Sequence, residues 1–189
     1  PLIQMFENGE FTISLNAGHF KVVDVLQTID CNLWQIFLHE AVDVEALLKQ
    51  IPQPDLVINS IADPEREAES LYMAEKLLDI WQPEAAIINK PARVLLTTRN
   101  QVSLTLGKLT GIDMPRTIRR DPGHQPLPVN EFNLEAGVFV RPVGVQTAYN
   151  LARYHDADKL QAYIQRQGAE ALFLTQFREF QSVDGMWRK

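Results

Sequence analysis

The chain has 189 residues, 46% of them hydrophobic and 22% charged, which is ordinary for a globular protein. The formal net charge of −6 argues against a general nucleic-acid binder, because such proteins usually carry a basic face. The single cysteine, Cys31, excludes an intrachain disulfide and a cysteine-based metal site. No run approaches the roughly 18 apolar residues that cross a bilayer, and Glu7 and Glu10 interrupt any signal pattern. We therefore expect a cytoplasmic protein without a nucleic-acid or membrane partner.

The first 53 residues predict two short strands and one short helix. Residues 11–15 and 20–26 are β-like, and residues 16–19 between them suit a turn, so a hairpin or two adjacent strands is expected. The segment 32–50 is ambiguous at first. Its later apolar residues follow helical spacing over 44–51, and Asp43 is placed to cap that helix.

An alternation of strands and helices follows from residue 55. Residues 55–61 predict a buried strand, and Asp63-Pro64-Glu65 is typical of a helix start. Residues 85–89 predict a second strand, and Pro91 opens a helix that is expected to run to about residue 109, before Gly111. Two strands that are each followed by a helix imply parallel pairing and a Rossmann-like sheet.

The segment 121–130 is the best candidate linker, because it holds three prolines and a glycine. It divides the chain into domains 1–120 and 131–189. Strands are predicted over 138–143 and 171–177, with a helix between them that Asp156 can cap. A polar turn around Asp184 then leads into a strand that is barely begun at Lys189, so we expect the second domain to be incomplete.

The stretch from Lys90 to Arg120 is basic, with seven Lys or Arg residues and Asp113 as its one acid. A basic segment inside an acidic protein could bind phosphate. A solvated helix face followed by a basic turn explains the same charges equally well.

Two stretches of the chain resemble ATP-grasp proteins. The first runs from Ile87 through Asn89-Lys90-Pro91 and Arg99 to Gly111-Ile112-Asp113-Met114-Pro115-Arg116-Thr117, and is similar to the segment that joins the pre-domain to the nucleotide-binding domain. The second comprises Val138-Phe139-Val140-Arg141-Pro142-Val143-Gly144, then 173–177 and 184–189, and looks like the phosphate-facing strand, the adenine-side strand and the next hairpin. The chain is most similar to ATP-grasp-like modules attached to tetratricopeptide-repeat regions in bacterial proteins.

This resemblance implies an α/β fold, in which a Rossmann-like pre-ATP-grasp domain precedes an incomplete α+β ATP-grasp N-terminal subdomain. Arg141 matches the phosphate-contacting position, Arg99 the basic residue of the preceding helix, and Gly144 the phosphate loop. Gln176 and Phe177 match the adenine-side strand end. ATP with Mg²⁺ is expected in the full-length protein, with nothing firmly bound by the fragment, and protein partners through attached repeats. No catalytic residue and no metal ligand is assigned.

Each of these residues also has a plain structural explanation. Arg141 could be an edge-strand charge and Arg99 a solvated helix residue, while Gln176 could be a polar strand end and Phe177 a core side chain. The loop 144–150 carries one glycine, whereas active family members tend to carry two or more, and side chains hinder the close approach of phosphate to backbone. The histidines, which are His19, His39, His124 and His155, show no metal-ligand spacing.

Three functions remain open at this point. The chain could be the nucleotide-binding front half of an ATP-dependent carboxylate–amine ligase, and no catalysis is expected of the fragment itself. Alternatively, it could be a degenerate, non-catalytic ATP-grasp-like module that serves protein interaction in a larger repeat protein, which the single loop glycine favours. A third alternative places another small ligand at the strand ends, near Asn59, Ser60 and Asn89.

Overall fold

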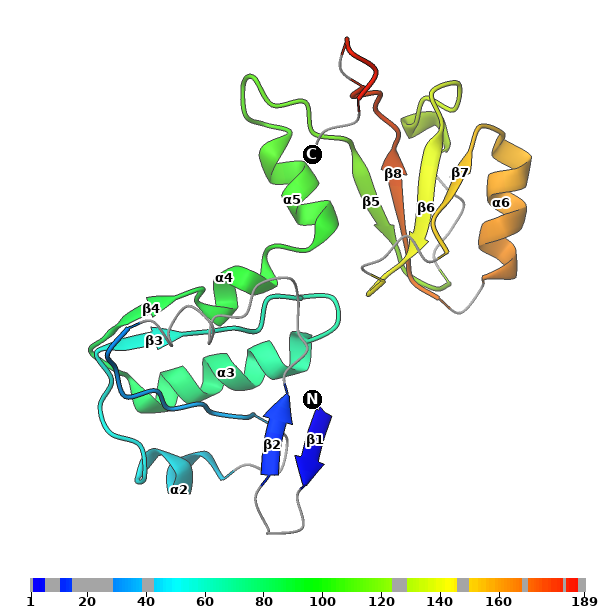
Figure 1. Ribbon diagram of the computed structural model, residues 1–189. Coiled ribbons are helices and arrows are strands. Elements are labelled where there is room, and N and C mark those ends of the chain that lie inside the picture. Colours follow the sequence, from blue (N-terminus) through cyan, green and yellow to red (C-terminus); the bar gives the residue numbers. More distant parts are fainter. Residues whose placement is uncertain are drawn as a thin grey trace. The chain divides into compact units, whose positions relative to one another are not determined.

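The structure is a computed structural model that describes residues 2–5, 11–14, 29–38, 43–123, 129–145, 150–167, 170–181 and 183–186 (Figure 1). The chain forms two compact units, Pro1–Gln53 and Pro54–Lys189. The predicted strand 20–26, the middle of the predicted linker and three of the four histidines lie outside the described residues. The division into domains at 121–130 therefore stays a prediction.

The first unit contains a hairpin and a short helix. Strand β1 (Leu2–Met5) pairs antiparallel with β2 (Phe11–Ser14) (Figure 1), so the strand predicted at 11–15 is confirmed and has an earlier segment as its partner. Helix α2 (Val44–Leu48) begins after Asp43, whose carboxylate accepts a hydrogen bond from the Ala46 amide at 3.0 Å. The predicted cap is confirmed.

The second unit opens with a β–α–β arrangement. Strands β3 (Leu56–Ile58) and β4 (Ala86–Ile88) pair in parallel, as predicted, and helix α3 (Ala68–Trp81) connects them. The apolar face of α3 buries Leu71, Ala74 and Leu77. The helix begins later than predicted, because the Asp63 carboxylate accepts from the amides of Glu65 and Arg66 and holds a separate turn there.

The prediction of a single helix after Pro91 is wrong, because the chain forms two helices there. Helix α4 (Pro91–Leu95) and helix α5 (Arg99–Leu106) are separated where the Thr97 hydroxyl donates back to the Val94 carbonyl and Thr98 turns extended, with ψ 151°. The start of α4 is capped by a residue that is distant in the sequence, since the Ala92 amide donates to the Glu75 carboxylate at 3.0 Å. A carboxylate at this position also complements the helix dipole.

The rest of the second unit is built on a four-stranded antiparallel sheet with the order β5-β8-β6-β7. Its strands are β5 (Thr117–Arg120), β6 (Val138–Pro142), β7 (Ala152–Tyr154) and β8 (Leu172–Gln176). A short 3₁₀ helix, η1 (Val129–Glu131), precedes β6. The strands predicted at 138–143 and 171–177 are confirmed, whereas β5 and β7 were not predicted.

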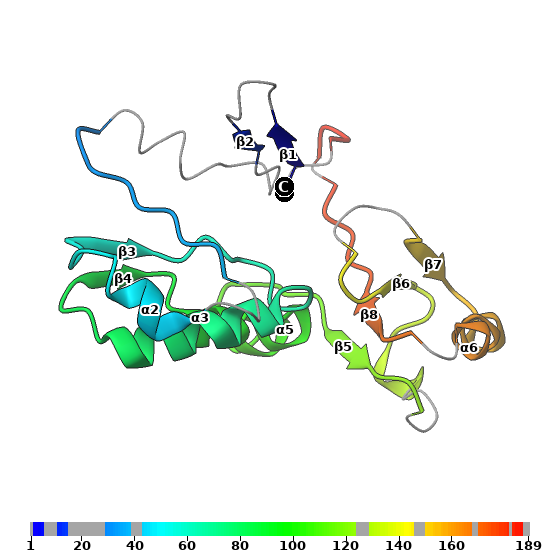
Figure 2. The same ribbon diagram turned by 90° about the horizontal axis from the view of Figure 1, so that it is seen from below.

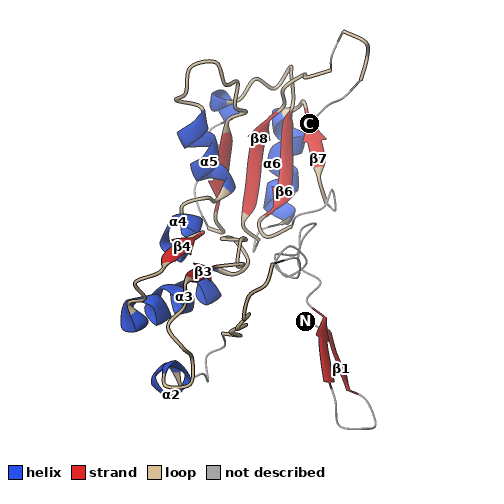
Figure 3. Ribbon diagram, turned by 60° about the vertical axis from the view of Figure 1, so that its left-hand side comes forward, coloured by secondary structure: helices blue, strands red, loops and turns tan. Residues whose placement is uncertain are grey.

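The two faces of this sheet have different environments. Helix α6 (Ala157–Arg166), capped by Asp156 as predicted, lies behind the sheet in Figure 3 and buries Leu160 and Ile164 against alternate residues of β6 and β8. The pairing register therefore puts Phe139, Arg141 and their cross-strand neighbours on the opposite face. Helix α5 lies beside β5 (Figure 2) and is tied to it by Ser103, whose hydroxyl accepts from the Thr117 amide.

The observed architecture is thus a mixed α/β structure, as the alternation of strands and helices predicts in general. No helix among the described residues combines the length and the apolar character that crossing a bilayer requires.

Candidate functional site

The candidate site is built on the end of strand β6 and the turn that follows it. Val138, Val140 and Pro142 alternate into the core, so the intervening Arg141 projects from the opposite face. Its guanidinium Nη2 donates to the Val145 carbonyl, which closes the turn. Gly144 lies inside this turn with a φ of 79°, a conformation that L side chains rarely adopt.

Arg99 and Glu65 act electrostatically on Arg141. Arg99 is the first residue of α5, and its backbone amide donates to Glu65 Oε1 at 2.8 Å. Burial lowers the pKa of Arg141, the positive charge of Arg99 lowers it further, and the Glu65 carboxylate opposes both. The charge of Arg99 therefore acts unfavourably on the Arg141 guanidinium, and the Glu65 carboxylate, which is bonded to the Arg99 backbone amide, acts favourably on it.

The Arg66 side chain, which comes from the turn before α3, packs against Gly144. A methyl group built onto Gly144 would lie 3.2 Å from Cγ of Arg66 and 3.9 Å from Cδ, so the Arg66 side chain packs against the glycine. Glycine at position 144 therefore meets two requirements, which are the positive φ of the turn and the space that the Arg66 side chain occupies. The three arginines come from three segments that are distant in the sequence.

Gln176 lies at the other end of the sheet. Arg141 pairs with Phe173, whereas Gln176 pairs with Val138, so the two side chains are separated by about 10 Å along the strands. The Gln176 Oε1 accepts from the Asn133 amide at 2.7 Å, and its Nε2 donates to the Asn133 and Gly137 carbonyls at 3.0 and 2.9 Å. The buried amide thus holds the loop before β6.

Phe177 follows Gln176 and is nearly buried, with 9% of its surface exposed. The Arg153 guanidinium carbon lies 3.5 Å from the centre of its ring, which is a cation–π contact. Phe139 meets the same ring edge to face, at 5.5 Å between centroids. One face of Phe177 is therefore already covered by Arg153.

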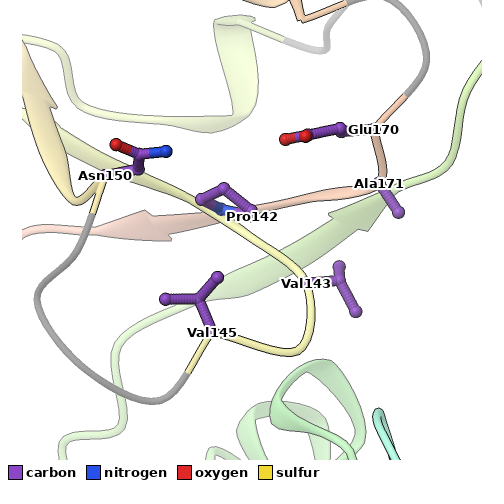
Figure 4. Close-up of a pocket in the computed structure, with 6 residues that line it drawn as sticks. All are labelled: Pro142, Val143, Val145, Asn150, Glu170 and Ala171. Atoms are coloured by element: carbon purple, nitrogen blue, oxygen red, sulfur yellow. The ribbon is translucent and has the colours of Figure 1, made fainter.

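Of the residues that the sequence singled out, Arg141 and Gly144 share the turn after β6 and the Arg99 charge acts on Arg141, whereas Gln176 and Phe177 lie elsewhere. An open pocket of about 440 Å³ adjoins the first group (Figure 4). Its lining comprises Pro142, Val143, Val145, Asn150, Glu170 and Ala171. The pocket is mainly apolar, and an amide and a carboxylate lie at its rim.

The strand ends of β3 and β4 are closed by their own side chains. The Asn59 Nδ2 donates to the Asn89 carbonyl at 2.9 Å, and the Asn89 Nδ2 donates back to the Asn59 carbonyl at 3.4 Å. Asn59 Oδ1 also accepts from the Ile61 amide. These side-chain amides join the two parallel strands. They therefore have fewer free hydrogen-bonding atoms for the small ligand that the third alternative places at these strand ends.

The described part of the chain contains no group of three His, Cys, Asp or Glu side chains that could hold a metal ion. The described histidine, His155, lies against the Glu135 carbonyl at 3.1 Å through Nδ1.

Glu65 and Arg66 are the site residues that sequence reasoning missed. The motif Asp63-Pro64-Glu65 indicated a helix start, which explains these residues without any site. A partial signal was present, because a turn capped by Asp63 projects consecutive side chains in fixed directions. Their proximity to Arg99 and Gly144 depends on packing between distant segments.

No protein-family model matches the chain, and a search of curated proteins finds no match. The resemblance to ATP-grasp proteins therefore stays a prediction.

Proposed function

We propose that the chain binds the phosphate groups of a nucleotide through Arg99 and Arg141, at the turn that contains Gly144. In this proposal the β3–α3–β4 region belongs to a Rossmann-like pre-ATP-grasp domain, and the four-stranded sheet with α6 belongs to the first ATP-grasp subdomain. The chain is then the nucleotide-binding front half of a protein related to ATP-dependent carboxylate–amine ligases, with ATP as the nucleotide.

The observation that supports the proposal most is the pairing of like charges at a glycine turn. Arg99 and Arg141 raise each other's electrostatic energy, and a bound polyanion would lower it. Guanidinium groups bind phosphate oxygens two at a time, and their charge-assisted hydrogen bonds are stronger than neutral ones. The turn that contains Gly144 holds the Arg141 guanidinium through its bond to the Val145 carbonyl.

The residues present fit the phosphates of ATP better than they fit its Mg²⁺. Arg99 and Arg141 are the cations of the proposed site, and Glu65 is the carboxylate that acts on Arg141. Mg²⁺ takes oxygen ligands and is commonly held by one or two carboxylates together with substrate phosphates. We assign no residue of this chain as a Mg²⁺ ligand, and the proposal covers binding without catalysis.

A second candidate function is a non-catalytic module that serves protein interaction. It is favoured by the internal use of two groups that the resemblance assigns to the nucleotide. The Gln176 amide holds the loop before β6, and the Arg141 guanidinium donates to Val145. Failure of the whole chain to bind ATP at millimolar concentration would favour this candidate.

Replacing Arg141 by alanine is expected to weaken ATP binding by about 10- to 100-fold, because one charge-assisted hydrogen bond contributes roughly 1.5–3 kcal/mol. Calorimetric titration of the 189-residue chain with ATP measures the dissociation constant. Arg99→Gln should weaken binding as well, and it leaves the turn bond from Arg141 to Val145 in place.

Arg153→Ala is the matched control, because Arg153 lies over Phe177 and donates to the Ala136 carbonyl rather than to the turn. This variant should keep the dissociation constant of the parent chain. Equal losses in the Arg141 and Arg153 variants, or unchanged affinity in both Arg99→Gln and Arg141→Ala, would overturn the proposed site.

A further inference from the structure

The turn before α3 directs two side chains of opposite charge toward the candidate site. The Asp63 carboxylate accepts from the Glu65 amide at 3.0 Å and from the Arg66 amide at 3.2 Å, and Pro64 between them is buried. The turn is therefore fixed at several points. Arg66 packs against Gly144, and Glu65 contacts the first residue of α5.

The Glu65 carboxylate bonds the backbone of one arginine that the proposed function assigns to phosphate and acts electrostatically on the side chain of the other. Its Oε1 accepts from the Arg99 backbone amide at 2.8 Å, and its charge acts favourably on the Arg141 guanidinium. Glu65 is partly buried, so solvent screens this interaction less than it would on an open surface. The protein thus supplies an anion of its own where the phosphate is proposed to bind.

Glu75 makes the same type of hydrogen bond as Glu65, from a carboxylate to a helix N-terminal amide, but away from the site. Its carboxylate accepts from the Ala92 amide at 3.0 Å, at the start of a helix that carries none of the proposed phosphate ligands. Capping alone therefore accounts for Glu75. For Glu65, the interaction with Arg141 is an additional feature that capping does not require.

We infer that Glu65 is an affinity-determining residue of the phosphate site, where it acts as an internal competitor of the ligand. This inference rests on the proposed function. When no phosphate is bound, the Glu65 carboxylate neutralises part of the charge of Arg141 and accepts the hydrogen bond of the Arg99 backbone amide. A phosphate bound at Arg99 and Arg141 must overcome repulsion from the carboxylate, so the affinity of the native chain is held below that of the same site without this negative charge.

The test is a calorimetric titration of ATP into the 189-residue chain and its variants Glu65→Gln and Glu75→Gln. Glutamine keeps the shape of the side chain and an oxygen that can accept from the Arg99 amide, and it removes the charge. We expect Glu65→Gln to bind ATP about tenfold more tightly than the parent chain. Glu75→Gln should match the parent chain, and the melting temperatures of all three report on folding.

A double variant, Glu65→Gln with Arg141→Ala, tests whether Glu65 lowers the affinity through its effect on Arg141. If Glu65 acts through Arg141, the gain from Glu65→Gln should shrink when the guanidinium is absent. Binding by the parent chain with unchanged or weaker binding by Glu65→Gln would overturn this inference and leave the proposed function standing. Absence of binding by the parent chain and by Glu65→Gln would overturn both, whereas binding by Glu65→Gln alone would support both.

Discussion

Replacing Gln176 by leucine is expected to lower the free energy of unfolding by about 3 kcal/mol. Leucine fills a similar volume, so the cost comes from hydrogen bonds rather than from a cavity. The Gln176 amide bonds the backbone of Asn133 in both directions and also bonds the Gly137 carbonyl. Each buried group that is left unpaired costs about 1–3 kcal/mol. Denaturant unfolding, followed by circular dichroism, measures the loss.

The control for this variant is Gln101→Leu, because Gln101 is exposed on α5 and the substitution is chemically the same. It should change stability by no more than about 0.5 kcal/mol, as surface substitutions usually do. Equal stability of the Gln176 variant and the parent chain would show that the loop before β6 does not depend on this amide.

Replacing Gly137 by alanine is expected to cost about 2–3 kcal/mol, through two effects that add. The residue has a φ of 97°, which strains any L side chain. The new methyl group would also lie 2.7 Å from Nε of Arg153 and 2.9 Å from Cε1 of His155. Arg153 would have to shift, which would weaken its cation–π contact with the Phe177 ring. Thermal unfolding measures the combined loss.

Gly111→Ala separates these two effects. Gly111 has a similar φ of 85°, but a methyl group there would meet no atom within 4 Å. The Gly111 variant should therefore show backbone strain alone, about 1 kcal/mol, and should melt at a higher temperature than the Gly137 variant. The reverse order would mean that Arg153 and His155 give way at little cost.

The local elements of the fold were largely predictable where a chemical signal lies close in the sequence. Asp43 and Asp156 cap the helices that follow them, because a side-chain oxygen needs only the amide three residues on. The apolar runs at 138–143 and 171–177 mark strands that are buried in the core. The parallel pairing of β3 and β4 follows from a helix between two strands.

The elements that were missed lack such a local signal. β7 has three residues, Ala152-Arg153-Tyr154, and its strand conformation comes from pairing with β6. β5 ends in two arginines, which resemble a solvated turn until β8 is placed beside them. The break between α4 and α5 depends on a Thr97 hydroxyl that bonds a carbonyl of the preceding turn, a choice that spacing alone does not reveal.

The candidate site was only partly predictable for the same reason. The resemblance selected Arg99, Arg141 and Gly144; Gly144 lies in the turn that Arg141 closes, and the charge of Arg99 acts on Arg141. Glu65 and Arg66 join them from 33 or more residues away, through tertiary contacts that no local pattern encodes. The network around Gln176 likewise links residues that lie 39 and 43 positions apart.

The most direct test of the phosphate site is a ³¹P NMR titration of ATP with the 189-residue chain, because the observed nuclei are the atoms that the arginines are proposed to contact. We expect the phosphorus resonances of ATP to shift or broaden with the parent chain and to stay at their free positions with the Arg99→Gln/Arg141→Gln double variant. The same change with both proteins, or no change with the parent chain at millimolar concentration, would contradict nucleotide binding at Arg99 and Arg141.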